Sequence, residues 1–316
     1  MLELLIILVF CAAIFTGISI GASSVPPAFG PVTSSGLIGI LESALLAGLA
    51  AGIGAVVQGG SVTDTIGSGI LMGEMQTLQA FIILLVASIL VIASVITKYP
   101  MPTAFTVVGA VIGSALSFGN GLRWDSIFRV AGYWILIPFL AMPIGYAFSM
   151  ALRYFLPKEK SKKAVRYLVF FMGLFVAYNA GANSVGLAVG PLQGLGYSTS
   201  FILIVGGVSI LIGAWIFSPK IIDAVSFEYS NIGPRRSAAA LGTAAILAQI
   251  GILFGIPISF NEAIIASIIG SGMVVGKANV GKKKIAYTTI AWIFAFFLAI
   301  GFTYSLGEVL QYLVSL

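Results

Sequence analysis

The chain has 316 residues, of which 59% are hydrophobic and only 8% are charged, with a net charge of +6. A soluble domain carries about 25% charged residues, so this chain lacks the polar side chains that a water-exposed exterior requires. Disorder requires low hydrophobicity and high charge, and a membrane β-barrel would show short alternating segments instead of long apolar runs. We therefore expect an all-α polytopic membrane protein.

Ten apolar segments follow one another along the chain, and a spanning helix needs about 20 apolar residues. The first has neither the charged region nor the cleavage site of a signal peptide, so we expect it to be retained. The fourth and ninth are short for a full crossing, which is typical of broken or re-entrant helices at the membrane midplane. The segments are residues 4–21, 37–58, 78–97, 104–118, 127–155, 167–189, 200–218, 236–255, 262–276 and 285–313.

Basic residues predict the orientation. When the segments alternate from an outside N-terminus, 14 of the 16 Lys and Arg residues fall inside, and only Arg123 and Arg129 fall outside. Cytoplasmic loops carry such an excess, so we expect a multi-pass protein of the cell membrane with both termini extracytoplasmic. The inside residues are Lys98, Arg153, Lys158, Lys160, Lys162, Lys163, Arg166, Lys220, Arg235, Arg236, Lys277, Lys282, Lys283 and Lys284.

The two halves of the chain resemble each other. Residues 21–31 (GASSVPPAFGP) and 181–191 (GANSVGLAVGP) are identical at seven of eleven positions, at an offset of 160. Trp134 recurs as Trp292 at nearly the same offset. Because each half carries five segments, the second half enters the membrane from the opposite side, giving two inverted-topology repeats, as in alternating-access transporters. We expect a first repeat at 1–156, a cytoplasmic linker at 157–166 and a second repeat at 167–316.

The repeated Gly-Ala motifs are the first candidate binding site. We expect their small residues and prolines to interrupt the first helix of each half and to expose backbone N–H groups. Hydroxyl and amide groups there would add neutral donors for a small oxyanion. The alternative is that the small residues only allow close helix packing. The candidate substrate-binding residues are Ser23, Ser24, Asn183 and Ser184.

A second pair of motifs opens the two short segments, at residues 99–106 (YPMPTAFT) and 256–263 (IPISFNEA). A proline can start each helix and Thr103, Ser259 or Asn261 can cap it, so these residues either cap the helices or also bind the anion. Glu262 heads the ninth segment. An intramembrane carboxylate is a functional candidate, and burial favours its protonated form, so Glu262 either couples transport to protons or is an interfacial first-turn acid.

Together these motifs resemble those of the inorganic phosphate transporter (PiT) family, which includes sulfate permeases, over about residues 17 to 300. The family carries two copies of a Gly-Ala-Asn-Asp-x-Ala-Asn-x-x-Gly motif and two of a Pro-x-Ser-Thr-Thr-His motif. The resemblance implies a homodimer that carries inorganic phosphate or sulfate through the lipid bilayer with H+ or Na+.

This chain departs from the family pattern at charged positions. The family Asp is Ser24 in one half and Ser184 in the other, and the family His falls on Phe105 and Glu262. The motif aspartates are implicated in sodium and substrate binding in the family, so their absence disfavours sodium coupling and phosphate. The sulfate-permease branch is similar to this chain at these positions.

We therefore expect a secondary active transporter that imports a tetrahedral oxyanion by alternating access, with sulfate in preference to phosphate. Glu262 is the candidate for coupling this transport to protons. The alternatives are a sodium- or proton-coupled phosphate transporter and a passive anion channel. An intramembrane enzyme would need clustered catalytic groups. The chain has no histidine, one cysteine and no close pair of acids, so we expect no enzyme, no cofactor, no metal site and no nucleic-acid partner.

Overall fold

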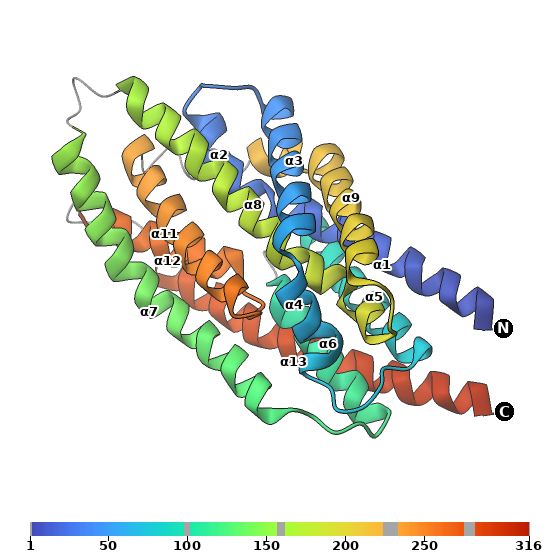
Figure 1. Ribbon diagram of the computed structural model, residues 1–316. Helices are drawn as coiled ribbons and strands as arrows, with labels where there is room; N and C mark the ends of the chain where they lie inside the picture. The colour runs from blue at the N-terminus through green and yellow to red at the C-terminus, as the bar shows by residue number, and fades with distance from the viewer. Residues whose placement is uncertain (1, 98–101, 157–161, 224–232, 275–281, 316) are drawn as a thin grey trace.

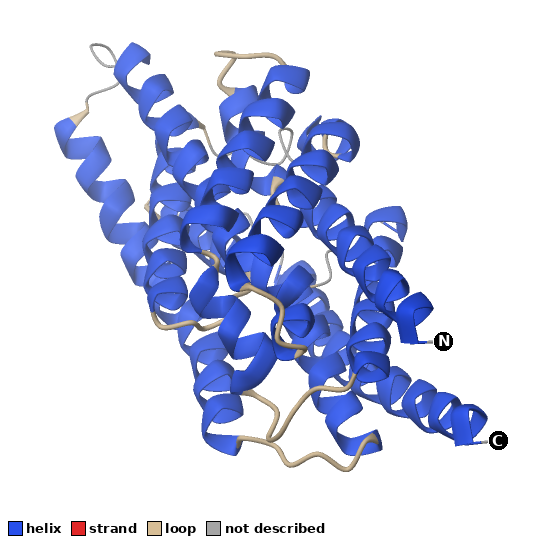
Figure 2. Ribbon diagram, turned by 45° about the vertical axis from the view of Figure 1, so that its right-hand side comes forward, coloured by secondary structure: helices blue, strands red, loops and turns tan. Residues whose placement is uncertain are grey.

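The computed structural model describes residues 2–97, 102–156, 162–223, 233–274 and 282–315. Within these ranges the chain is helical, and a single isolated bridge joins Leu71 and Leu122 (Figure 2). The predicted all-α membrane fold is confirmed. The helices are α1 (Leu2–Ser24), α2 (Pro26–Ser34), α3 (Ile40–Gln58), α4 (Gly60–Asp64), a π-helical turn η1 (Thr65–Gly69), α5 (Thr77–Thr97), α6 (Thr103–Ser117), α7 (Trp124–Phe155), α8 (Lys162–Gly194), α9 (Thr199–Phe217), α11 (Pro234–Leu253), α12 (Phe260–Met273) and α13 (Lys282–Ser315).

Each of the ten predicted segments corresponds to a helix. Among the described residues, eight helical stretches are long and apolar enough to cross a membrane, the first of them comprising α1 and α2 together. The fourth and ninth segments form α6 and α12, of 15 and 14 residues. At about 1.5 Å per residue, both are shorter than the hydrocarbon core of about 30 Å.

The α5–α6 and α11–α12 hairpins enter the bundle from opposite ends. The first hairpin is open at the end where α5 begins and α6 ends. There the N–H of Arg123, the residue directly before α7, donates to Ile70 O at 2.8 Å. α7 has 32 residues and is about 48 Å long. Near the other end of α7, Arg153 Nη1 donates at 3.1 Å to the O atom of Val274, the residue that follows α12. Val274 lines a cavity with Pro234, the first residue of α11, so the open end of the second hairpin lies there. The two hairpins therefore have the inverted relation expected of the repeats.

Close helix contacts recur in the two halves. Gly21 of α1 packs against the backbone of Ile210 in α9, and Gly181 of α8 packs against the backbone of Ala51 in α3. Residues 21 and 181 are 160 positions apart, and 51 and 210 are 159 apart, so this is one contact made twice. A Cβ atom at either glycine would overlap the facing backbone, which explains the Gly-Ala start of both motifs.

The termini lie side by side at one end of the molecule, opposite the end where α7 leads into α8 (Figures 1 and 2). This arrangement follows from ten helical segments that alternate in direction. Residues 162–166 of the predicted linker form the first turn of α8, and residues 157–161 lie outside the described ranges. The predicted repeat boundaries stay predictions.

Candidate functional site

The first Gly-Ala motif lies where the first helix breaks. α1 ends at Ser24, and α2 begins at Pro26 after the single residue Val25, which confirms the predicted interruption. The Ser24 hydroxyl is 3.3 Å from the Thr103 hydroxyl at the start of α6. Ser23 Oγ lies 3.5 Å from Ser24 Oγ, so three of the predicted residues form one set of neighbouring hydroxyl groups.

The break at the first motif does not provide the backbone donors that we expected there. Pro26 and Pro27 occupy the first two positions of α2, and proline has no N–H group. The N–H of Ala28 donates to Val25 O at 3.1 Å. The donors at this motif are therefore the side-chain hydroxyl groups.

The predicted interruption at the second motif is wrong, because α8 runs without a break from Lys162 to Gly194. The two prolines of the first motif are replaced by Gly186 and Leu187, which keep the N–H groups that an α-helix needs. Gly186 is tolerated within the helix because it packs against the backbone of α4. The packing alternative therefore explains the glycines of this motif.

Asn183 holds the linker between α11 and α12. Its Oδ1 accepts from Ile258 N–H at 2.8 Å, and its Nδ2 donates to Ile258 O at 3.1 Å. The side chain is only 1% exposed. This bidentate contact engages both the oxygen and the nitrogen of the amide that we predicted to bind substrate. By contrast, the hydroxyl of the neighbouring Ser184 is fully buried and has no hydrogen-bond partner among the described residues.

The start of α12 places Glu262 inside the protein. Ser259 caps the helix, as predicted, and its Oγ accepts from Glu262 N–H at 3.4 Å. Glu262 is 7% exposed, and its Oε2 has no hydrogen-bond partner among the described residues. The backbone of Asn261 belongs to α12, but its side chain lies outside the described part of the structure. The burial of Glu262 disagrees with the alternative that it is a first-turn acid at the membrane interface.

Trp134 of α7 joins the two hairpins and was not among the predicted site residues. Its Nε1 donates to Pro257 O at 2.7 Å, next to the linker residue that Asn183 holds. Its ring stacks on Phe105 of α6, with centroids 3.8 Å apart and planes inclined by 14°. The hydroxyl set around Thr103 and the linker held by Asn183 are therefore connected through α6 and Trp134, although no direct hydrogen bond between the two sets is recorded in the described residues.

This arrangement favours an anion that accepts several hydrogen bonds. The hydroxyls of Ser24, Thr103 and Ser184 can each donate. α6 and α12 both begin inside the bundle, and a helix N-terminus supplies N–H groups and partial positive charge. Glu262 in its neutral form is a further donor. Neutral donors of this kind can hold a small oxyanion without a basic side chain.

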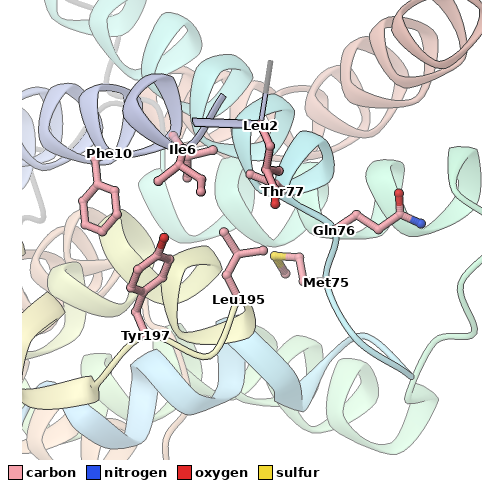
Figure 3. A pocket seen from close by; sticks show the side chains of 9 residues that line it. Leu2, Ile6, Phe10, Met75, Gln76, Thr77, Leu195 and Tyr197 are labelled. Carbon is pink, nitrogen blue, oxygen red and sulfur yellow. The ribbon is translucent and has the colours of Figure 1, made fainter. Parts of the chain in front are cut away.

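A separate cavity of about 460 Å³ lies beside the N-terminal turns of α1 (Figure 3). Apolar side chains such as Leu2, Phe10 and Leu195 dominate its wall, with Gln76 and Thr77 at one side (Figure 3). None of the predicted site residues lines it. Its mostly apolar wall differs from the neutral hydrogen-bond donors near Thr103 and Ser184.

The chain is similar to known membrane transport proteins. The sequence profile of the phosphate transporter family matches residues 20–168 and 156–303. The chain is 30% identical to the sulfate permease CysP of Bacillus subtilis over 302 residues, which is 93% of this chain and 85% of that protein. It is 22% identical to a protein of Chlamydia pneumoniae that is provisionally named a phosphate permease, over 92% of this chain and 95% of that one.

A solved structure titled "The sodium-dependent phosphate transporter" has the same fold. Its TM-score is 0.79 at 17% sequence identity, over 98% of this chain and 99% of that chain. The comparisons agree with the membrane fold, the repeated motifs and a transport role. The chain belongs to the phosphate transporter family.

Proposed function

We propose that the protein is a secondary active transporter that imports an inorganic tetrahedral oxyanion across the cell membrane by alternating access, with both termini extracytoplasmic and sulfate the preferred substrate. The observation that supports this proposal is that α6 and α12, from two inverted hairpins, both begin inside the bundle beside buried neutral donors and are linked through Trp134. Ser24 and Thr103 supply hydroxyls at the start of α6, and Ser184 supplies a buried hydroxyl next to Asn183, which holds the linker before α12. The similarity to a sulfate permease supports the choice of substrate.

The donor set explains why sulfate is preferred. Monohydrogen phosphate carries an O–H group that needs an acceptor, and a carboxylate is the natural one. Sulfate has no proton to donate, and an ionised carboxylate would repel it. Serines stand at both family Asp positions, Ser24 and Ser184, so the site offers donors and removes two repulsive charges, which is how specificity against a competitor arises.

Coupling to protons is assigned to Glu262. Its carboxyl group is buried and one of its oxygens has no protein partner. When protonated, it is neutral and can donate to an oxyanion; when ionised, it repels the oxyanion and favours release. A proton and the anion would therefore be carried together. Sodium- or proton-coupled phosphate transport is the alternative, and a passive anion channel is the second.

Uptake into proteoliposomes tests the substrate. We expect saturable uptake of labelled sulfate, inhibited by unlabelled sulfate more strongly than by phosphate, with counterflow of preloaded sulfate. The variant Ser24→Ala should lower apparent affinity, whereas Ser88→Ala, which removes a buried hydroxyl bonded to Leu85 O at 2.9 Å within α5, should not. Stronger inhibition by phosphate would establish the alternative substrate, and uptake without saturation or counterflow would establish a channel.

An imposed pH gradient tests the coupling. We expect an inward proton gradient to drive sulfate accumulation in the wild type and an inward sodium gradient to have no effect. Glu262→Gln should abolish the response to the proton gradient while sulfate exchange continues, because a neutral amide can still donate. The matched control is Glu308→Gln in α13, where the carboxylate is exposed. An unchanged proton response in Glu262→Gln would refute the coupling.

A further inference from the structure

A cavity of about 650 Å³ lies at the end of the molecule where α7 and α12 end and where α8 and α11 begin. It shares no lining residue with the donor set around Thr103 and Asn183. Its described wall contains five basic residues and no acidic one. A concave surface lined by basic side chains concentrates positive potential. The basic residues are Arg153, Lys162, Arg166, Arg235 and Arg236.

Two helix N-termini add to this positive potential. α8 begins at Lys162, and α11 begins at Pro234 with Arg235 and Arg236 in its first turn. Neither helix has an acidic residue in its first turn, although acids are the residues that the partial positive charge of a helix N-terminus favours. An anion in the cavity would interact favourably with both helix ends and with the basic side chains.

The wall of the cavity is held in place by contacts between α7 and α12. Arg153 Nη1 donates to Val274 O at 3.1 Å. Ser149 Oγ lies one turn earlier, is 1% exposed, and donates to Ser271 O at 3.4 Å. Four of the five basic residues are arginines, whose planar guanidinium groups match the oxygens of a phosphate group in two-point contacts.

Exposed aromatic residues flank the same end of the molecule. Tyr154 and Phe155 close α7 and are 80% and 74% exposed, and Tyr167 in the first turns of α8 is 55% exposed. Aromatic side chains concentrate at the level of the lipid headgroups. A phosphate group is therefore available to the cavity both from the membrane and from the adjacent water.

We propose that this cavity binds a phosphate group, supplied by an anionic phospholipid headgroup or by free inorganic phosphate. The site lies at the open end of the α11–α12 hairpin, away from the candidate transport site. It therefore does not depend on which anion is transported.

Charge-neutralised pairs test the proposal on the purified full-length protein. The test variants are Arg235→Gln with Arg236→Gln, and Lys162→Gln with Arg166→Gln. The matched control is Lys163→Gln with Lys220→Gln, two exposed residues that do not line the cavity. One arm measures retention of dioleoyl phosphatidylglycerol against phosphatidylcholine by native mass spectrometry. The other measures equilibrium binding of labelled inorganic phosphate in a neutral detergent.

We expect the wild type and the control to bind alike, and each test pair to bind at least about tenfold more weakly, since each basic residue contributes about a fivefold effect on anion binding. Weaker lipid retention alone identifies the headgroup as the ligand, and weaker binding of inorganic phosphate alone identifies the free anion. Equal binding by test pairs and control in both arms overturns the proposal. If a test pair does not fold, equal retention of phosphatidylglycerol and phosphatidylcholine by the wild type, together with absent phosphate binding, overturns it as well.

Discussion

Asn183 and Ser184 are adjacent in α8, and the structure predicts different effects when each is replaced by alanine. Asn183→Ala removes two hydrogen bonds, of 2.8 Å and 3.1 Å, to the backbone of Ile258. Ile258 is fully buried, so its N–H and C=O groups would lose their partners away from water. Each such group costs about 1–3 kcal/mol, and the variant should therefore lose about 2–6 kcal/mol of stability.

Ser184→Ala removes a hydroxyl that has no hydrogen-bond partner among the described residues. No protein hydrogen bond is lost, so the stability of the empty protein should be unchanged or slightly higher. If the hydroxyl donates to the transported anion, its loss should cost about 1 kcal/mol of binding, or roughly a fivefold rise in the apparent KM for sulfate.

Thermal unfolding followed by tryptophan fluorescence, together with sulfate uptake at varied concentration, separates the two effects. Asn183→Ala should unfold several degrees below the wild type, whereas Ser184→Ala should unfold with the wild type and gain less stabilisation from added sulfate. Early unfolding of Ser184→Ala would show that its hydroxyl is structural. An unchanged unfolding temperature in Asn183→Ala would refute the role of Asn183 in holding the α11–α12 linker.

Two further substitutions probe the scaffold around the site. Trp134→Phe removes the donor to Pro257 O at 2.7 Å but keeps a ring for stacking, so it should cost about 1–3 kcal/mol in thermal unfolding. Trp134→Ala also loses the ring and should cost more. Unfolding of Trp134→Phe at the wild-type temperature would contradict the contribution of the hydrogen bond. Gly181→Ala places a methyl group against the backbone of Ala51 and should lower the yield of monodisperse protein in size-exclusion chromatography. Gly132→Ala in α7, which meets open space, is the control, and similar yields for both glycine variants would contradict the close contact.

The positions of the helices were predictable because membrane segments are specified by local composition. Twenty apolar residues must form a helix wherever they lie in lipid, since backbone groups have no other partners there. The break after Ser24 was predictable for a similarly local reason, because Pro26 and Pro27 lack N–H groups. The second motif was misread as a helix break because the close approach of α4 accommodates Gly186 within the helix, which local sequence does not show.

The contacts that connect the site residues could be recognised only in the folded structure. Trp134 and its hydrogen-bond partner Pro257 are 123 residues apart, and each lies in an apolar stretch that resembles many others. The recurrence of Trp134 as Trp292 after 158 residues marked it as a repeated feature without indicating its contacts. Asn183 was predicted as a substrate ligand because of its amide donors, and local sequence did not indicate that the same amide binds the backbone of Ile258.

Among the described residues, the first motif restrains the start of α6 less than the second motif restrains the start of α12, and this predicts which helix start loosens first. At α6, the recorded hydrogen bond with the first motif within the described ranges is one hydroxyl pair, Ser24 with Thr103, at 3.3 Å. At α12, Asn183 makes two shorter hydrogen bonds, and Ser259 caps the helix. Local opening free energy falls where fewer buried contacts restrain a segment.

Amide hydrogen exchange in lipid nanodiscs tests this inequality. The first-turn amides of α6 should exchange faster than those of α12 in the wild type. Asn183→Ala should speed exchange at α12 and leave α6 unchanged. Exchange at α6 as slow as at α12 in the wild type would contradict the expected order. Because alternating access requires the two inverted halves to exchange conformations, the more weakly restrained start of α6 is where we expect the transport cycle to begin.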